Sequence, residues 1–344
     1  MDFLKWKVIG KIKEARDAYT FVLKNENERH VNYQAGQFLT FIFEHKGKEI
    51  RRSYSISSSP GIDEHISITV KRTPNGEISR HLINHVHVND ILTSIRPAGR
   101  FTVETKINSK DQFFFIAAGS GIVPIFSLIK KILKEEPLSE IILIYQNHSE
   151  KDIIFKNHFE ELLKGHSAQF KWINFLSNPE NHEHHAQKLT NFLLEKLVLE
   201  NKIEIENIFF YLCGPVSFMR MAQFTLKWMG FDDNHIRKEN FTVDFIPPPP
   251  LINDPSPKKI MIHYNKKIYE IEAAYPVSIL QAALDKNIQL PYSCRSGRCA
   301  TCIAKCTKGK IKMSNNEVLT DKDLQEGLVL TCVGYAESDL ELEW

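Results

Sequence analysis

The pattern of apolar and polar positions changes twice along the chain. Over residues 1–105 the apolar residues are mostly β-branched or aromatic, and they fall in short segments between turn residues. Such segments are typical of strands, and several at close spacing favour a small antiparallel β-barrel. The segments are FLKWKVIGKI, AYTFVLKN, QFLTFIFEHKGKEIRRSYSIS and HISITVKRT.

From about residue 111, continuous apolar strands alternate with segments of helical periodicity. DQFFFIAAG is an uninterrupted apolar run, whereas VPIFSLIKKILKEE repeats its apolar residues at helical spacing. This alternation predicts a parallel sheet covered by helices on both faces. The later segments are EIILIYQN, DIIFKNHFEELLK, QFKWINFLS, NIFFYLCG and PVSFMRMAQFTLKWMG.

A proline-rich stretch, DFIPPPPLINDPSPKK, interrupts the pattern at residues 244–259. Consecutive prolines continue neither a helix nor a central strand, so we predict a semi-rigid linker. Beyond it, a strand pair and the helix SILQAALDKN precede a cysteine-rich loop. A chain of 344 residues is too long for one core. We predict a barrel over 1–106, an α/β domain over 107–245, a linker over 246–257 and an α+β domain over 258–344.

Composition narrows the class of protein. A net charge of +2 gives no reason to expect nucleic acid as a partner. The N-terminus shows no apolar core with a cleavage site, and no apolar run reaches the roughly 18 residues of a membrane span. We therefore expect a cytoplasmic protein that does not bind membranes. Six cysteines in that compartment favour metal or redox chemistry over disulfides.

Three cysteines stand within the nine residues CRSGRCATC, and Cys332 stands alone further on. Zinc sites usually combine two close pairs, or a pair with histidines. The spacing C-x4-C-x2-C…C is instead that of plant-type 2Fe–2S clusters, whose loop lets two thiolates reach each iron. We predict the metal ligands Cys294, Cys299, Cys302 and Cys332, with zinc as the alternative. Cys306 falls outside the spacing, and the histidine-rich NHEHH at 181–185 is interpreted as a polar loop.

The stretch RRSYSISSSP, residues 51–60, ends a predicted strand and resembles the flavin motif Arg-x-Tyr-Ser of the ferredoxin–NADP reductase superfamily. Arg52, Tyr54 and Ser55 match the motif. The resemblance implies that the arginine holds a flavin phosphate, the tyrosine stacks on the isoalloxazine and the serine reaches its N5 edge. These side chains suit the roles, because a guanidinium binds phosphate bidentately and a tyrosine offers a flat face with a polar tip.

A second flavin segment of that family, Gly-x-x-Ser at a helix start, is matched by Gly76 and Ser79 in VKRTPNGEISRHL. Exposed amides at a helix N-terminus bind phosphate without a charged side chain. The resemblance adds Val70, Lys71 and Ile78 to the expected cofactor contacts. The alternative interpretation is a turn followed by a capped helix.

The stretch FFFIAAGSGIVPIFSLI predicts a strand, a glycine turn and a helix. Gly119 and Gly121 allow a tight turn and a close approach to a pyrophosphate. Pro124 suits the first turn of the helix. The GxGxxP pattern resembles the reductase superfamily rather than the dehydrogenases, and the resemblance places Ser120 in the same turn.

The resemblance extends to a Cys-Gly-Pro motif in FFYLCGPVSFMRM, matched by Cys213, Gly214 and Pro215. It implies that Cys213 lies beside the nicotinamide, whereas the alternative is a buried thiol that closes a strand. We expect Tyr54, Ser55 and Cys213 to be the catalytic residues. Phe241 in KENFTVDF is our candidate for an aromatic ring that covers the flavin until nicotinamide arrives.

Taken together, the motifs resemble the reductase components of multicomponent oxygenases over the whole chain, nearest the phenylacetyl-CoA epoxidase reductase subgroup. The resemblance implies an NAD(P)H-dependent oxidoreductase with a flavin barrel, a nucleotide domain and a β-grasp ferredoxin domain. Such a protein takes two electrons from a nicotinamide and passes them singly through flavin and cluster to a terminal oxygenase. Alternatives are a reductase for a hybrid-cluster or other redox protein, and a non-catalytic redox sensor.

Two cofactor questions stay open in the sequence. We favour FAD over FMN because of the Gly76…Ser79 segment, although phthalate dioxygenase reductase shares the domain order and uses FMN. The sequence does not decide between NADH and NADPH. The 2′-phosphate of NADPH is usually bound by a cationic side chain after the second strand of the parallel sheet. That stretch, YQNHSEKD, offers Ser149 and Lys151 but no arginine, and Glu150 opposes a phosphate.

The charges near the cysteines suggest a docking surface for the acceptor. Six basic residues with no acid between them, the basic collar, surround the cluster loop, and acidic residues dominate further on. We expect the collar to meet an acidic patch on the terminal oxygenase, with a solvated surface as the alternative. The collar consists of Arg295, Arg298, Lys305, Lys308, Lys310 and Lys312.

Overall fold

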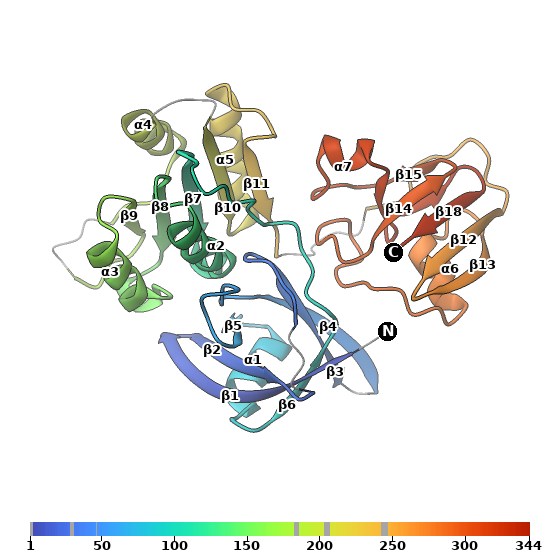
Figure 1. Cartoon of the computed structure of the whole chain (residues 1–344), viewed down its shortest axis with the longest axis horizontal. Coiled ribbons are helices and arrows are strands. Elements are labelled where there is room, and N and C mark those ends of the chain that lie inside the picture. Colours follow the sequence, from blue (N-terminus) through green and yellow to red (C-terminus); the bar gives the residue numbers. More distant parts are fainter. Residues whose placement is uncertain (1–2, 28–30, 46, 182–185, 203–206, 242–246) are drawn as a thin grey trace. The chain divides into compact units, whose positions relative to one another are not determined.

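The computed structural model describes residues 3–27, 31–45, 47–181, 186–202, 207–241 and 247–344 (Figure 1). The chain forms two compact units. Among the described residues, the larger unit lies within Phe3–Pro97 and Phe101–Phe241, and the smaller one comprises residues 247–344 with Ala98–Arg100. Residues 182–185 of the histidine-rich segment and residue 246 of the predicted linker lie outside the described ranges.

The larger unit begins with a six-stranded sheet, ordered β4-β3-β6-β1-β2-β5, in which neighbouring strands are antiparallel. A bridge between Ile56 and Ile68 brings the ends of the two edge strands together, as a barrel requires. Trp6 is buried inside, and its indole donates to Ser94 Oγ at 2.7 Å. The strands are β1 (Leu4–Ala15), β2 (Ala18–Asn25), β3 (Phe38–His45), β4 (Lys48–Ser55), β5 (Ile66–Lys71) and β6 (Ile91–Ser94).

Helix α1 (Glu77–His85) belongs to the barrel rather than to the next sheet. Its residues Ile78, Leu82 and Ile83 are buried in the same core as Trp6. Because these positions recur at helical spacing, one face of α1 is apolar and the other is left for polar side chains. The N-terminus of α1 is thereby fixed beside β5.

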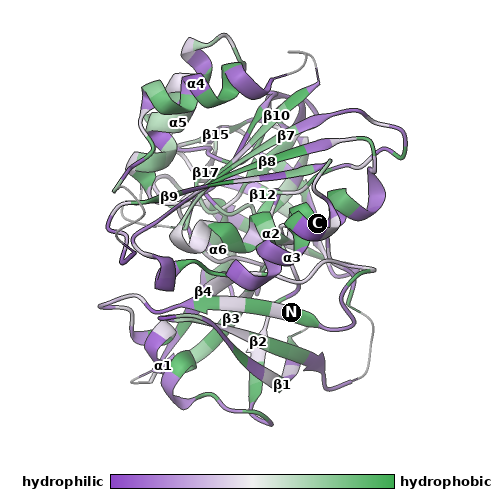
Figure 2. Ribbon diagram, turned by 90° about the vertical axis from the view of Figure 1, so that its left-hand side faces the viewer, coloured by the Kyte–Doolittle hydropathy of each residue, from purple (hydrophilic) through white to green (hydrophobic). Residues whose placement is uncertain are grey.

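The second sheet of this unit is five-stranded and parallel, ordered β11-β10-β7-β8-β9. The order reverses between β7 and β10, and this is where open α/β sheets bind their ligands. Figure 2 shows the central strands as almost wholly apolar. The strands are β7 (Gln112–Ala118), β8 (Glu140–Asn147), β9 (Phe170–Leu176), β10 (Ile208–Cys213) and β11 (Ile236–Glu239).

Helices cover both faces of this sheet. Phe113 and Phe115 pack with α2 and α3, whereas Phe114 and Ile116 pack with α4 and α5. Successive strand residues point to opposite faces, so β7 supplies both cores and must be apolar throughout. The helices are α2 (Ile122–Glu135), α3 (Lys156–Gly165), α4 (Asn191–Asn201) and α5 (Val216–Trp228).

The smaller unit holds a five-stranded mixed sheet, ordered β13-β12-β18-β14-β16, and a two-stranded sheet of β15 and β17. Its core includes Ile279 and Leu280 of α6 together with Cys302 and Cys332. The elements are β12 (Lys258–Tyr264), β13 (Lys267–Ala273), α6 (Ile279–Asp285), β14 (Ile303–Lys308), β15 (Ile311–Met313), α7 (Asp321–Gln325), β16 (Leu328–Leu330), β17 (Gly334–Ala336) and β18 (Leu340–Glu343).

The predicted fold class, an antiparallel barrel, a parallel α/β sheet and a ferredoxin-like α+β fold, is confirmed. Two elements differ from their expected extent. The segment 37–57 forms the hairpin of β3 and β4, with Gly47 at its turn. The helix expected from residue 152 begins at Lys156, because Ile153–Phe155 are buried after a 3-10 turn. Among the described residues no helix is long and apolar enough to cross a membrane.

Candidate functional site

The first flavin segment lies at the end of β4. Arg52 is exposed, and its guanidinium donates to the carbonyl of Arg51 at 2.8 Å. The Tyr54 ring lies 6.3 Å from Phe41, and burial raises the pKa of its phenol, which therefore stays neutral. Ser55 is buried one residue further on. The strand thus presents an exposed cation, a neutral aromatic ring and a buried hydroxyl in sequence.

The second flavin segment is built around Gly76, which precedes α1. A Cβ at this position would lie 2.6 Å from Ser79 Oγ and 2.7 Å from Thr73 Cβ, so the close approach requires glycine. Ser79 Oγ accepts from the amide of Thr73 at 3.1 Å and shapes the turn. Val70 and Ile78 are buried in the barrel core, so only their backbone is left for a cofactor.

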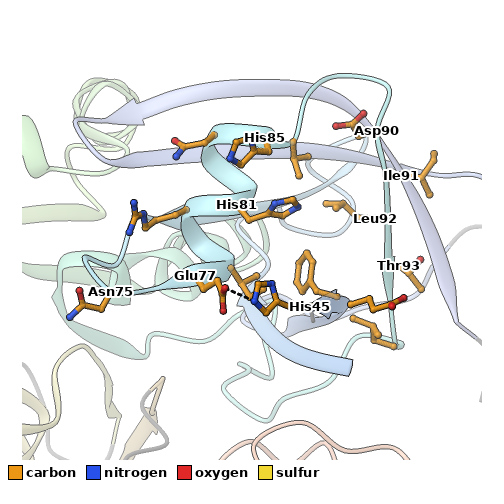
Figure 3. Close-up of a pocket in the computed structure, with 16 residues that line it drawn as sticks. His45, Asn75, Glu77, His81, His85, Asp90, Ile91, Leu92 and Thr93 are labelled. Carbon is orange, nitrogen blue, oxygen red and sulfur yellow. Dashed lines mark ion pairs between the residues drawn. The ribbon is translucent and has the colours of Figure 1, made fainter. Parts of the chain in front are cut away.

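A pocket of about 1060 Å³ opens beside this segment, between α1 and the strands β3 and β6 (Figure 3). Glu77 in the first turn of α1 forms an ion pair with His45 at 2.7 Å. Phe43 and His81, which also line the pocket, meet edge to face at 6.3 Å. The pocket therefore begins at the turn before α1 and continues along the rings of Phe43 and His81.

The glycine turn lies at the switch point of the parallel sheet. Gly119 has a φ of +55°, which favours glycine. A Cβ on Gly121 would lie 2.0 Å from the carbonyl oxygen of Cys213, so β7 and β10 approach too closely for any other residue. Pro124 is buried in the first turn of α2, and Pro215 precedes α5. Ser120 lies in the 3-10 turn between the two glycines.

Two further residues shape that turn. Tyr145, at the end of β8, donates its hydroxyl to the carbonyl of Gly119 at 3.0 Å, and burial raises its pKa. Lys71 Nζ lies 3.4 Å from where a Cβ on Gly119 would be. The predicted flavin residue Lys71 therefore brings its charge to the dinucleotide turn. Tyr145 was not predicted, because within EIILIYQN it is simply another apolar strand residue.

A buried carboxyl that the sequence analysis missed joins the two sheets of this unit. Glu239 ends β11 opposite Cys213, and its Oε2 accepts from Ser55 Oγ at 3.2 Å. Burial raises the pKa of Glu239 to about 8, and the Ser55 hydroxyl lowers it in part. Burial also raises the pKa of the Cys213 thiol, with Glu239 adding to the effect. Ser55, Cys213 and Glu239 thus form one group that keeps its protons at neutral pH.

The four predicted cluster ligands come together in two pairs. The amide of Cys294 donates to Cys299 Sγ at 3.5 Å, and the amide of Ser296 donates to Cys294 Sγ at the same distance. Contact with Cys294 raises the pKa of Cys299, and contact with Cys332 raises that of Cys302. The pairs are therefore Cys294 with Cys299, and Cys302 with Cys332.

Two thiol pairs suit a cluster with two irons, each held by two thiolates. A single zinc ion needs one tetrahedron of ligands instead. Amides already donate to the sulfurs, as a 2Fe–2S cluster uses them. Cys306 lies outside both pairs and donates its thiol to the carbonyl of Lys308 at 3.3 Å.

Part of the basic collar is already neutralised. Arg298 donates its Nε to Glu317 Oε1 at 2.9 Å, and both side chains are mostly buried. Glu317 is one of the acidic residues that follow the collar in the sequence, so the predicted separation of charge is incomplete. Arg295 is exposed and lies over the Tyr292 ring at 4.3 Å. The collar that reaches solvent consists of Arg295, Lys305, Lys308, Lys310 and Lys312.

Phe241, the candidate for a ring over the flavin, is 45% exposed and follows β11 by two residues. Its covering role stays a prediction. The same holds for the cofactor contacts assigned to each motif residue. The structure brings the predicted flavin and nucleotide residues into one unit and the four predicted cluster ligands into the other.

Comparison with known proteins identifies all three modules. Residues 5–103 match the family described as oxidoreductase FAD-binding domain, and residues 115–223 match oxidoreductase NAD-binding domain. Residues 262–337 match the 2Fe-2S iron-sulfur cluster binding domain. The chain is 30% identical to one of the subunits of 1,2-phenylacetyl-CoA epoxidase from Escherichia coli (strain K12), covering 93% of this chain and 91% of the relative. The chain belongs to this family of modular flavin and iron–sulfur reductases, which confirms the expected oxidoreductase, its FAD and its cluster.

Other relatives share the architecture. The ferredoxin reductase component of 3-ketosteroid-9-alpha-monooxygenase from Mycolicibacterium smegmatis (strain ATCC 700084 / mc(2)155) is 28% identical, over 98% of this chain and 95% of its own length. The structure of phthalate dioxygenase reductase aligns with a TM-score of 0.59 at 22% identity, covering 99% of this chain and 98% of that protein. This second likeness shows the same fold.

Proposed function

We propose that this chain is the reductase component of a multicomponent oxygenase, passing electrons from NAD(P)H through FAD and a 2Fe–2S cluster to the terminal oxygenase. The observation that carries the proposal is the presence of a flavin motif, a dinucleotide turn and two thiol pairs in one chain. Relatives with the same order, covered over 91% and 95% of their lengths, are named as oxygenase components. When bound, the flavin accepts a hydride and the cluster passes electrons on singly.

Different residues of the larger unit position the flavin and the nicotinamide dinucleotide. Arg52 and the amides after Gly76 would hold the flavin phosphates, and Tyr54 would contact the ring system. Lys71 and the turn at Gly119 would hold the pyrophosphate of the nicotinamide dinucleotide. Ser55, Cys213 and Glu239 would form a buried polar group beside the nicotinamide. Holding both ring systems in register is the main contribution of the protein.

The pocket beside α1 supports FAD over FMN. FAD differs from FMN by an adenylyl group, and the pocket continues from the phosphate turn along Phe43 and His81. We expect His81→Ala to weaken FAD binding about tenfold while changing FMN binding little, because only FAD reaches that far. Flavin titration of the deflavinated protein, followed by fluorescence, measures both constants. Equal losses for FAD and FMN contradict this placement.

The solvent-exposed collar supports docking of an acidic acceptor. Rim charges mainly raise association rates, and salt screens them over about 10 Å at 0.1 M. Arg295→Glu should slow reduction of the oxygenase at low salt by about tenfold and leave reduction of a small neutral quinone unchanged. Arg298 is unsuitable for this test, because its ion pair with Glu317 is part of the loop's structure.

Lys267→Glu provides the matched control. Lys267 is exposed on β13, the strand at the opposite edge of the sheet from β14 and β16. It carries the same charge change away from the cluster loop. Equal effects of Arg295→Glu and Lys267→Glu, or no effect of salt, contradict docking at the collar.

The acceptor is tested by reconstitution. Purified holoprotein and NADH or NADPH are combined with the oxygenase subunits of the two relatives' systems, and with a hybrid-cluster protein, and acceptor reduction is recorded. We expect turnover with an oxygenase. Transfer confined to the hybrid-cluster protein points to the other reductase class, and negligible turnover even with ferricyanide points to a redox sensor. The cytoplasmic location stays a prediction, which cell fractionation tests.

A further inference from the structure

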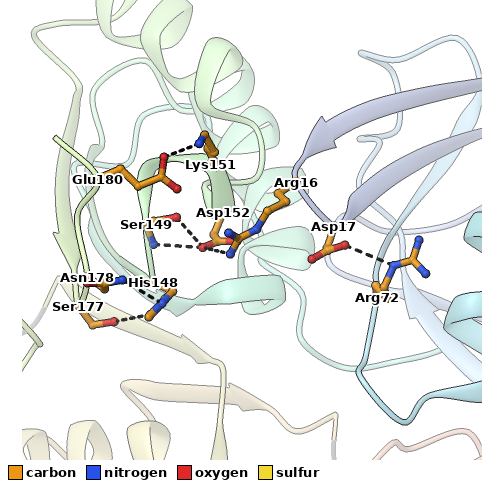
Figure 4. Close-up of polar contacts among 10 residues, drawn as sticks. All are labelled: Arg16, Asp17, Arg72, His148, Ser149, Lys151, Asp152, Ser177, Asn178 and Glu180. Atoms are coloured by element: carbon orange, nitrogen blue, oxygen red, sulfur yellow. Dashed lines mark hydrogen bonds and ion pairs between the residues drawn. The ribbon is translucent and has the colours of Figure 1, made fainter.

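The carboxyl ends of β8 and β9 carry a set of polar residues that the proposed function does not yet use (Figure 4). His148 and Glu150 follow β8, and Ser177 and Asn178 follow β9. In sheets of this kind the second strand ends where the adenosine ribose of the dinucleotide binds. Ser177 Oγ lies 3.2 Å from Nδ1 of His148, and Asn178 Nδ2 lies 3.4 Å from Nε2. These residues therefore form one surface at the ribose end of the site.

The loop after β8 is held firmly against the barrel. Arg16 Nη2 donates to both carboxylate oxygens of Asp152, at 2.8 and 2.9 Å, and the Arg16 amide donates to the carbonyl of Lys151. Asp152 also accepts from the hydroxyl and the amide of Ser149. With its side chain only 7% exposed, Asp152 fixes the backbone on both sides of Glu150.

Glu150 is half-buried and clamped between the two strand ends. Its Oε2 accepts from the amide of Glu180 at 2.7 Å, and its Oε1 from the amide of Asn181 at 3.2 Å. The neighbouring cations are engaged, since Lys151 pairs with Glu180 at 2.6 Å and Arg16 pairs with Asp152. Among the described residues of these two loops, the side-chain charge that backbone amides hold in place is therefore negative.

We propose that Glu150 is the residue that sets the nicotinamide preference of this chain and that it favours NADH. This inference rests on the proposed function, because it needs a nicotinamide donor. NADPH differs from NADH by a dianionic phosphate on the adenosine 2′-oxygen, whereas NADH carries a hydroxyl that donates to a carboxylate. A carboxylate held in place by two amides cannot move away from that phosphate, so it repels NADPH and accepts NADH.

One cation opposes this effect. Lys188 is exposed in a stretch that crosses the same strand ends, since the amide of Gln187 donates to Leu176 and that of Leu189 donates to Gln146. Its flexible, solvated side chain gives a screened attraction, whereas Glu150 is partly shielded and fixed. The structure therefore assigns the controlling role to Glu150, and Lys188 becomes the sharpest control.

The test measures kcat/KM for NADH and for NADPH with ferricyanide as acceptor, on the holoprotein. The wild type should favour NADH by about tenfold, and Glu150→Gln, which keeps an acceptor for the amides, should reduce that ratio about fivefold by improving NADPH. Asn178→Arg, which adds a cation without touching the clamp, should change the ratio in the same direction. Lys188→Gln and Glu161→Gln, an exposed carboxylate on α3, should leave the ratio within about twofold.

Inhibition constants of adenosine 5′-phosphate and adenosine 2′,5′-bisphosphate provide a second readout that does not depend on hydride transfer. Glu150→Gln should tighten only the bisphosphate. A wild type that prefers NADPH, a ratio unchanged in Glu150→Gln with NADH activity retained, or a collapse of NADPH activity in Lys188→Gln overturns the inference. Absence of any nicotinamide oxidation contradicts the proposed function instead.

Discussion

At the scale of single residues, Glu239 has the most unusual environment in the larger unit. It is 9% exposed, lies opposite Cys213 and accepts from Ser55. A buried carboxyl with a pKa near 8 holds a proton at pH 7, where an exposed glutamate does not. Because Glu239 keeps this proton, it adds no negative charge beside Ser55 and Cys213 at neutral pH.

The raised pKa of Glu239 predicts how stability depends on pH. Because the native state holds the proton up to about pH 8 and the unfolded chain releases it near the ordinary value, the native state binds more protons between these limits. The associated stability is complete below the ordinary pKa and is lost as pH rises through about 8. The thermal unfolding temperature of the wild type should therefore fall more steeply between pH 5 and pH 9 than that of Glu239→Gln. If the unfolding temperatures of the two proteins change equally with pH, Glu239 is not the origin of this pH dependence.

Cys306 offers a second test at the residue scale. Its thiol donates to the carbonyl of Lys308, and it belongs to neither thiol pair. We expect Cys306→Ser to keep the visible spectrum and the iron content of the cluster, because serine also donates to a carbonyl. Iron analysis with absorbance spectroscopy measures both, and loss of half of the iron contradicts the ligand assignment.

At the scale of elements, the approach of β7 to β10 decides where the dinucleotide binds. A Cβ on Gly121 would meet the Cys213 carbonyl at 2.0 Å, so the strand ends must separate to admit it. Gly121→Ala should destabilise the larger unit by about 1–3 kcal/mol and weaken NADH binding. Gly165→Ala at the end of α3 is the control, because nothing lies within 4 Å of its added Cβ. Thermal unfolding and the KM for NADH compare the two variants, and equal behaviour contradicts the role of this contact.

Elements with a strong local pattern were predictable from the sequence. The apolar run of β7, the glycine turn and the cysteine spacing can each be recognised from a short stretch of sequence. Helix α4 was not recognised, because apolar residues lie on both of its faces: Leu194 and Val198 are buried, whereas Phe192 and Leu199 are exposed. Strands β6 and β11, four residues each, are too short to show an alternation.

Contacts between distant segments were not predictable in the same way. Glu239 stands between Lys238 and Asn240, which makes it resemble an exposed position, and only the pairing of β10 with β11 buries it. Arg298 was expected in the solvent-exposed collar, and only the fold places Glu317 beside it. The clamp on Glu150 likewise depends on the meeting of two loops. The motifs thus indicated the cofactors, but the electrostatics of the site required the tertiary structure.

At the scale of the whole molecule, the modular arrangement has a direct consequence. The four predicted cluster ligands lie in a unit with its own core, and residues 247–257 at the start of that unit contain no helix or strand. Cys299→Ser should therefore remove the cluster but keep the flavin and NADH–ferricyanide activity within about twofold of the wild type. Iron content, flavin content and steady-state rates measure this, and loss of the ferricyanide activity contradicts independent modules.

The central claim is that electrons from a nicotinamide reach the cluster through the flavin of the same chain. The most direct measurement is anaerobic titration of the holoprotein with NADH, followed by electron paramagnetic resonance and by flavin absorbance. The account predicts bleaching of the flavin together with the signal of a one-electron-reduced 2Fe–2S cluster, and bleaching without that signal in Cys299→Ser. A wild-type cluster that stays oxidised while its flavin is fully reduced contradicts the account.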